Sequence, residues 1–118
     1  MAQDFQNLTV WQRAMELAEA VYEVTKRFPT EELYGLTSQL RRASVSIASN
    51  IAEGRGRGTD GEFRYFLNIA QGSTYEVQTQ LLLARRLKIG NEDSLKKAEA
   101  LCTEISKMLG AFIQSVRS

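Results

Sequence analysis

The sequence contains no histidine, and this absence removes the side chain that proteins use most often as a metal ligand and as a general base near neutral pH. Cys102 is the only cysteine, which excludes an intrachain disulfide and a cysteine-based metal cluster and favours a reducing compartment, the cytoplasm. Charges of the two signs nearly cancel, because the chain has 15 lysines and arginines and 14 aspartates and glutamates. Any contact with nucleic acid must therefore come from a local patch of charge.

Long apolar runs are missing as well. No segment approaches the ~20 apolar residues that cross a bilayer, and the N-terminus lacks the basic start and apolar run of a secretory signal. We therefore expect a soluble, unexported protein that does not bind a membrane. The length of 118 residues and the hydrophobic content of 43% suit one domain over residues 1–118.

Only a few residues interrupt helix formation. Pro29, the glycines at 54, 56 and 58, and Gly90 divide the chain into predicted helices at about residues 10–28, 31–54, 60–89 and 92–116. Each predicted helix has a capping residue at its start, namely Thr9 (with Gln12), Thr30, Thr59 (with Glu62) and Asn91. Because the connections are short, the sequence predicts an all-α, antiparallel, up-and-down four-helix bundle.

Apolar residues recur at heptad spacing along these segments. The first stripe is Val10, Ala14, Leu17, Val21, Val24 and Phe28, and the last is Leu95, Ala98, Cys102, Ile105, Leu109, Phe112 and Val116. In the second segment Asn50 occupies a stripe position, so we predict that Asn50 and Ser46 form a buried polar core that fixes the register of the helices. We also expect Gly72 and Ser73 to let a neighbouring backbone approach closely near Ser44 and Ser46.

A second apolar line runs beside the core stripe of the first predicted helix, through Trp11, Met15 and Tyr22. One interpretation is a thick intramolecular core. The other is a subunit interface, because a small bundle with a large apolar patch usually covers it. We prefer the second interpretation, which makes the protein a homo-oligomer.

Arginines around the central glycines form the candidate nucleic-acid site. Arginine on a flexible glycine backbone can grip phosphates bidentately, and Tyr65 could stack on an unpaired base. The candidate binding residues are Arg41, Arg42, Arg55, Arg57 and Arg64. The alternative interpretation is that these side chains complement the negative end of a helix capped by Gly54 or lie on a solvated face.

Catalysis has little support in the sequence. Glu53 and Glu62 flank the glycine turn and could be imagined as paired carboxylates, but no histidine, phosphate-binding loop or serine nucleophile motif accompanies them. We therefore predict no catalytic residue, no metal site, no cofactor and no enzyme activity.

Six segments in order carry a family resemblance: LTVWQ (8–12), FP (28–29), ELYGLT (32–37), QLRRA (39–43), SIASNIAEG (46–54) and FLNIAQGS (66–73). They resemble the 23S ribosomal RNA intervening-sequence proteins, also called four-helix bundle proteins. The resemblance implies antiparallel bundles that assemble as rings of five, some of them encoded in insertions within large-subunit ribosomal RNA genes. The bundle also resembles the accessory protein of diversity-generating retroelements, a basic pentameric barrel that binds nucleic acid and a reverse transcriptase.

Two function classes follow. The first is a non-enzymatic homopentamer that binds RNA or DNA through the arginine and glycine turn. The alternative is an oligomeric scaffold for protein partners that binds no nucleic acid. Neither the ligand nor the biological process can be read from the residues.

Overall fold

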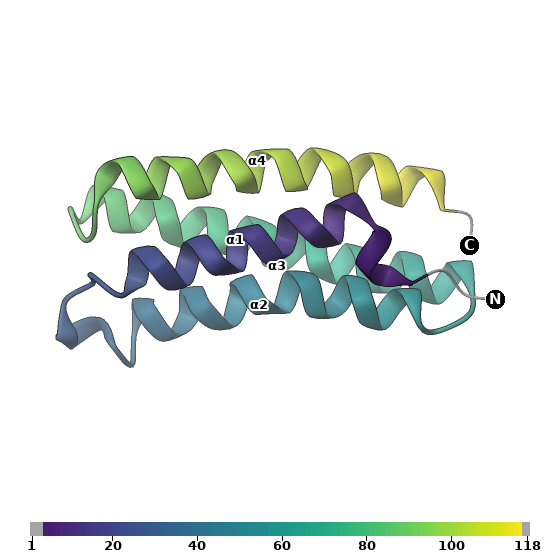
Figure 1. Cartoon of the computed structure of the whole chain (residues 1–118), viewed down its shortest axis with the longest axis horizontal. Coiled ribbons are helices and arrows are strands. Elements are labelled where there is room, and N and C mark those ends of the chain that lie inside the picture. Colours follow the sequence, from purple (N-terminus) through teal and green to yellow (C-terminus); the bar gives the residue numbers. More distant parts are fainter. Residues whose placement is uncertain (1–3, 117–118) are drawn as a thin grey trace.

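The computed structural model describes residues 4–116 and contains four long α-helices that lie side by side (Figure 1). The helices are α1 (Thr9–Thr25), α2 (Leu36–Arg55), α3 (Asp60–Arg86) and α4 (Glu92–Ser115), with two short 3-10 helices, η1 (Phe5–Asn7) and η2 (Thr30–Glu32). Each long helix packs against its neighbours in the sequence, α1 also packs against α4, and no strand occurs among residues 4–116. The predicted all-α four-helix bundle is confirmed, while residues 1–3 and 117–118 of the predicted domain lie outside the described residues.

The bundle measures 46 × 22 × 20 Å. Figure 1 places the α1–α2 and α3–α4 connections at one end and the α2–α3 turn at the other. We call the first the connection end and the second the turn end.

The predicted ends of three helices were wrong by several residues. Helix α1 ends at Thr25 and α2 begins at Leu36, because Pro29 disfavours helical backbone at the residue before it and η2 forms a separate short turn. Helix α3 ends at Arg86, where the N–H groups of Lys88 and Ile89 bond to the carbonyls of Arg85 and Ala84. These bonds and the left-handed backbone of Lys88 (φ 58°) form the usual pattern that closes a helix.

The predicted caps were confirmed at two helices. The Thr59 hydroxyl accepts from the N–H of Glu62 at the start of α3, and Asn91 accepts from the N–H of Ser94 at the start of α4. The predicted cap at Thr9 was wrong, since Thr9 is already helical and the extended residue before α1 is Leu8, which cannot cap. Thr30 starts only the short η2.

The core follows the predicted heptad stripes. Residues fully hidden from solvent include Ala14, Leu17 and Val21 of α1 and Ala98, Cys102, Ile105 and Leu109 of α4. Phe112 is only half-buried and packs edge-to-face on Phe63 of α3 with ring centres 5.2 Å apart. Burial of these stripes is the main source of stability for the bundle.

The close approach of α2 and α3 occurs at Gly54, and its assignment to Gly72 was wrong. A Cβ atom on Gly54 would lie 2.6 Å from Cβ of Phe66, whereas a Cβ on Gly72 would meet nothing within 4 Å. Gly72 lies on the exposed side of α3. Its neighbour Ser73 does reach α2 as predicted, because the hydroxyls of Ser46 and Ser73 are 2.9 Å apart.

The predicted polar core is half-buried. The Asn50 amide donates to the carbonyl and the hydroxyl of Ser46 within α2, at 2.8 and 3.0 Å. Of the side-chain hydrogen bonds that Ser46 and Asn50 make within residues 4–116, only the one between Ser46 and Ser73 crosses to a second helix. The fully hidden hydroxyls belong to Ser44 and Thr74, which bond to the backbone of their own helices.

Candidate nucleic-acid and self-association surfaces

Three of the five candidate arginines lie at the turn end. The Arg55 guanidinium lies 5.4 Å from the centre of the Phe63 ring. Arg57 pairs with Glu53 at 2.6 Å and lies 4.9 Å from the centre of the Phe66 ring. Arg64 donates to the carbonyl of Val116 at 3.2 Å. Each of the three therefore already has an intramolecular partner.

The other two candidate arginines, Arg41 and Arg42, lie near the start of α2. At 1.5 Å per residue, Arg41 and Arg55 are separated by about 21 Å along the helix axis. The structure thus does not bring the five arginines of one chain together. Arg42 is exposed and donates to the Ser38 hydroxyl at 3.1 Å, and Arg41 donates to the Thr25 hydroxyl at 2.9 Å.

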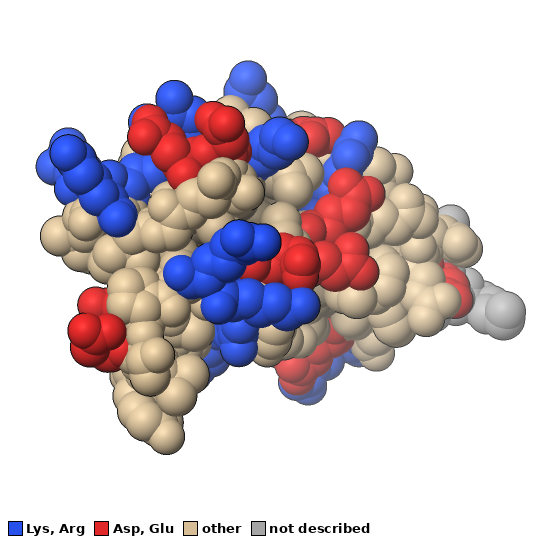
Figure 2. All heavy atoms as spheres, turned by 60° about the vertical axis from the view of Figure 1, so that its left-hand side comes forward, with Lys and Arg blue, Asp and Glu red and all other residues tan. Residues whose placement is uncertain are grey.

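Other cations gather at the connection end, at the close of α3. Arg85 pairs with Glu99 of α4 at 2.9 Å, and both side chains are largely buried. Arg86 and Lys88 are exposed. On the face seen in Figure 2, which brings this end forward, lysines and arginines mix with aspartates and glutamates. That face therefore carries no broad field of one sign.

The candidate interface residues on α1 differ in exposure. Trp11 is half-buried against the core, and its ring contacts that of Phe5 edge-to-face with centres 5.2 Å apart. Met15 and Tyr22 are 39% and 43% exposed. The thick-core interpretation thus describes Trp11, while Met15 and Tyr22 present apolar surface to solvent.

Helix α3 has an exposed apolar face that the sequence analysis missed. Its exposed members are Tyr65, Tyr75, Leu82 and Leu83, followed after the helix by Leu87. Glu76 is the only charged residue between positions 65 and 84. A solvated helix face usually carries several charges. The near absence of charge over about five helical turns was therefore the feature of the sequence that could have predicted this exposed apolar face.

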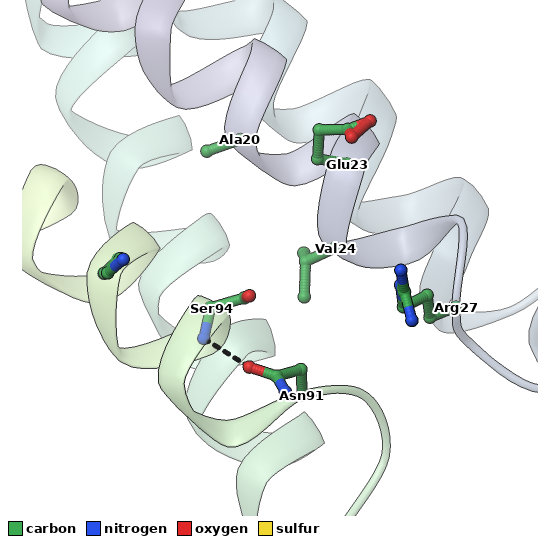
Figure 3. Close-up of a pocket in the computed structure, with 7 residues that line it drawn as sticks. Ala20, Glu23, Val24, Arg27, Asn91 and Ser94 are labelled. Atoms are coloured by element: carbon green, nitrogen blue, oxygen red, sulfur yellow. Dashed lines mark hydrogen bonds between the residues drawn. The ribbon is translucent and has the colours of Figure 1, made fainter.

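A cleft of about 500 Å³ lies between α1 and α4 near the connection end (Figure 3). Its lining combines apolar, polar and charged side chains of both signs, from Ala20, Glu23, Val24, Arg27, Asn91, Ser94 and Lys97. Asn91 is committed to capping α4 through Ser94, as the dashed line shows. Glu23 also has a partner, because its carboxylate pairs with Lys26 at 2.8 Å.

The carboxylates considered for catalysis both have structural tasks. Glu53 pairs with Arg57, and Glu62 bonds to the Thr59 hydroxyl that caps α3. Across residues 4–116, no three histidine, cysteine or acidic side chains are grouped so that they could hold a metal ion. Within the same residues, no helix is both long enough and apolar enough to cross a membrane.

Burial makes Cys102 unreactive. The residue is fully hidden in the core, and burial, helped by the nearby Glu99 carboxylate, raises the pKa of its thiol to about 12. The thiolate is the reactive form of cysteine, so it is scarce at neutral pH. Cys102 is thus a small core residue.

The fold and its surfaces define a small all-helical bundle. The pattern of the 23S rRNA-intervening sequence protein family matches residues 6–111, so the chain belongs to this family. No curated protein matches the chain. A solved structure from Bacteroides thetaiotaomicron, described as a protein with unknown function from the S23 ribosomal protein family, superposes with a TM-score of 0.83. It is 24% identical and the match covers 96% of this chain and 100% of that one, a likeness that establishes the fold alone.

Proposed function

We propose that the protein is a self-associating helical scaffold whose assembly uses the exposed apolar face of α1. The supporting observation is the exposure of Met15 and Tyr22, two large apolar side chains that lie about two helical turns apart on α1 and are 39% and 43% exposed. Such surface on a small bundle is usually covered by a partner. The ring of five implied by the family resemblance is the arrangement that we propose.

The test is the mass in solution, measured by light scattering coupled to size exclusion. Five chains of 13.3 kDa give about 67 kDa in a closed ring. We expect Met15→Glu to lower this mass toward that of the monomer, because it would bury a charge at the contact. Leu82→Glu on α3 is the matched control, as the two side chains are 39% and 44% exposed.

Three results separate the alternatives. A monomer at micromolar concentration would refute self-association. If Leu82→Glu disrupted the assembly and Met15→Glu left it intact, the interface would lie on α3 and not on α1. An assembly of another size would refute only the ring of five.

A second candidate function is binding of single-stranded RNA or DNA at the turn end. It is supported by Arg55 and Arg57 beside the exposed Gly56 and Gly58, with Tyr65 62% exposed one turn into α3. In a ring, this weak site would be repeated, and repeated weak contacts raise the overall affinity. Because the chain is nearly neutral overall, the binding would depend on these few phosphate contacts.

Fluorescence anisotropy with labelled RNA and DNA 20-mers tests this candidate. We expect binding at 50 mM salt that weakens about tenfold or more at 200 mM, as phosphate contacts do. The double variant Arg55→Gln/Arg57→Gln should lose this binding. The control Arg86→Gln/Lys88→Gln, with the same change of charge at the connection end, should retain it. No binding at low salt by a correctly assembled protein would eliminate the candidate and leave the scaffold.

A further inference from the structure

A second cleft lies at the connection end, between the end of α1, the chain around Pro29 and the start of α2. Its volume is about 340 Å³. Phe28, Pro29 and Leu33 supply apolar walls, while Lys26 after α1 and Thr37 and Arg41 of α2 supply polar groups. We call it the Arg41 cleft.

The Arg41 side chain is held in place on two sides. Its Nε–H donates to the Thr25 hydroxyl at 2.9 Å, and that hydroxyl donates in turn to the Val21 carbonyl at 2.7 Å. The guanidinium also lies over the Tyr22 ring, 4.6 Å from its centre. These contacts occupy the Nε edge and one face, and leave the edge formed by the two Nη groups for a ligand.

No carboxylate of the described chain balances this charge. Arg41 is half-buried, and no acidic oxygen among residues 4–116 lies within 4 Å of its nitrogens, nor does either Nη group donate to a protein atom there. The nearby Lys26 is already paired with Glu23 at 2.8 Å, and Glu32 accepts from the N–H of Leu36. A partly buried charge without a counter-ion is costly.

Thr37 provides a second polar group without a partner. The residue lines the Arg41 cleft and is only 4% exposed, but its hydroxyl oxygen is not one of the fully buried, unpartnered polar atoms of residues 4–116, so it remains accessible from the cleft. Together, a guanidinium edge and a hydroxyl donor are the groups that bind an oxyanion, and one uncompensated positive charge matches one carboxylate.

We propose that the Arg41 cleft binds a carboxylate and that an acidic side chain of a second copy of the chain supplies it. The inference rests on the proposed self-association, because Tyr22, which supports Arg41, belongs to the apolar face of α1. The chain also contains carboxylates that have no cationic partner of their own within residues 4–116. Besides the half-buried Glu32, the acidic residues with no cation within 4 Å among the described residues are all exposed, namely Asp4, Glu19, Glu31, Asp60, Glu62, Glu76 and Asp93.

The first test measures the dissociation of the assembly by dilution. We expect Arg41→Gln to weaken assembly about 30-fold or more, because it would leave the partner's carboxylate buried and unpaired. Arg42→Gln is the matched control, since Arg42 is the adjacent, exposed arginine and, within residues 4–116, bonds only to Ser38. Assembly of the wild type should weaken as salt is raised from 50 to 300 mM, and Arg41→Gln should lose most of that dependence.

The second test identifies the carboxylate and does not depend on how well the glutamine variant folds. In Arg41→Lys, a carbodiimide should couple the introduced amine to the contacting carboxylate and produce a covalent dimer, and peptide mass spectrometry should name the acidic residue. Arg42→Lys is the control. Unchanged dissociation of Arg41→Gln, or no dimer specific to Arg41→Lys, would overturn the inference while leaving self-association intact. A wild-type monomer would overturn both.

Discussion

Gly54→Ala is predicted to destabilise the bundle because α2 and α3 lie closest at this residue. The added Cβ would lie 2.6 Å from Cβ of Phe66 and 3.1 Å from Cδ1 of Phe63. Carbon atoms in contact prefer about 3.5–4.0 Å, so the helices must separate by about 1 Å. The atom in the way is a Cβ, which cannot move without its backbone, so a rotamer change gives no relief.

The size of the effect follows from two opposing contributions. Overpacking of this kind costs about 1–3 kcal/mol, and replacing glycine by alanine in a helix returns at most about 1 kcal/mol. We expect a net loss of about 1–2 kcal/mol, which lowers the midpoint of thermal unfolding by about 4–8 °C for a chain of this size.

Gly72→Ala is the matched control within the same pair of helices. Its Cβ would meet nothing within 4 Å, so only the gain in helix propensity remains. We expect an increase of about 0.5–1 kcal/mol in the free energy of unfolding. Circular dichroism during thermal and urea unfolding measures both variants, at chain concentrations where their assembly is the same. A Gly54→Ala protein as stable as the wild type, or a destabilised Gly72→Ala protein, would refute the assigned point of approach.

Three other predictions concern one buried thiol and two pairs of side chains. The Cys102 thiol should resist a thiol-specific reagent at pH 8 in the folded protein and react once urea unfolds the chain, because burial raises its pKa to about 12. Rapid labelling of the folded protein would contradict this prediction. The hydrogen bond and the charge of Lys26 lower the pKa of the Glu23 carboxyl below 4.5. The pair therefore stabilises the fold at pH values above the pKa that Glu23 has in the unfolded chain, and this stabilisation is lost as the pH falls through the pKa of Glu23 in the folded protein. An NMR titration of Lys26→Gln should show a higher Glu23 pKa than in the wild type. A double-mutant cycle of Ser46→Ala and Ser73→Ala should give a coupling energy of about 1 kcal/mol for the bond between α2 and α3, and a coupling near zero would show that the bond does not contribute.

The sequence predicted the features that depend on local spacing. Heptad stripes identify the core because residues three and four apart share a helix face, and this rule does not require knowledge of the partner helix. The caps at Thr59 and Asn91 were predictable for the same reason, since each bonds to an N–H three residues later. Thr9 has the same spacing but is already helical, and spacing alone does not give the backbone conformation of Leu8.

The surroundings of the arginines could not be predicted in this way. Arg41 contacts Thr25 and Arg64 contacts Val116, and both pairs are brought together only by packing between helices. The same limit applies to Gly54 and Gly72. Both were visible as helix interruptions, but only the packing of α2 on α3 decides which of them another helix approaches.

The positions of the proposed sites make their tests independent. The candidate nucleic-acid site lies at the turn end, whereas the Arg41 cleft lies about 20 Å away along α2, near the connection end. Variants that far apart and without shared partners are expected to have additive effects on stability. If Arg41→Gln weakened RNA binding by an assembled protein, the ligand would have to contact both ends of the bundle, within one chain or across subunits. If it weakened only assembly, the arginines at the two ends would have separate functions, and the adjacent Arg41 and Arg42 would differ because only Arg41 is fixed over Tyr22.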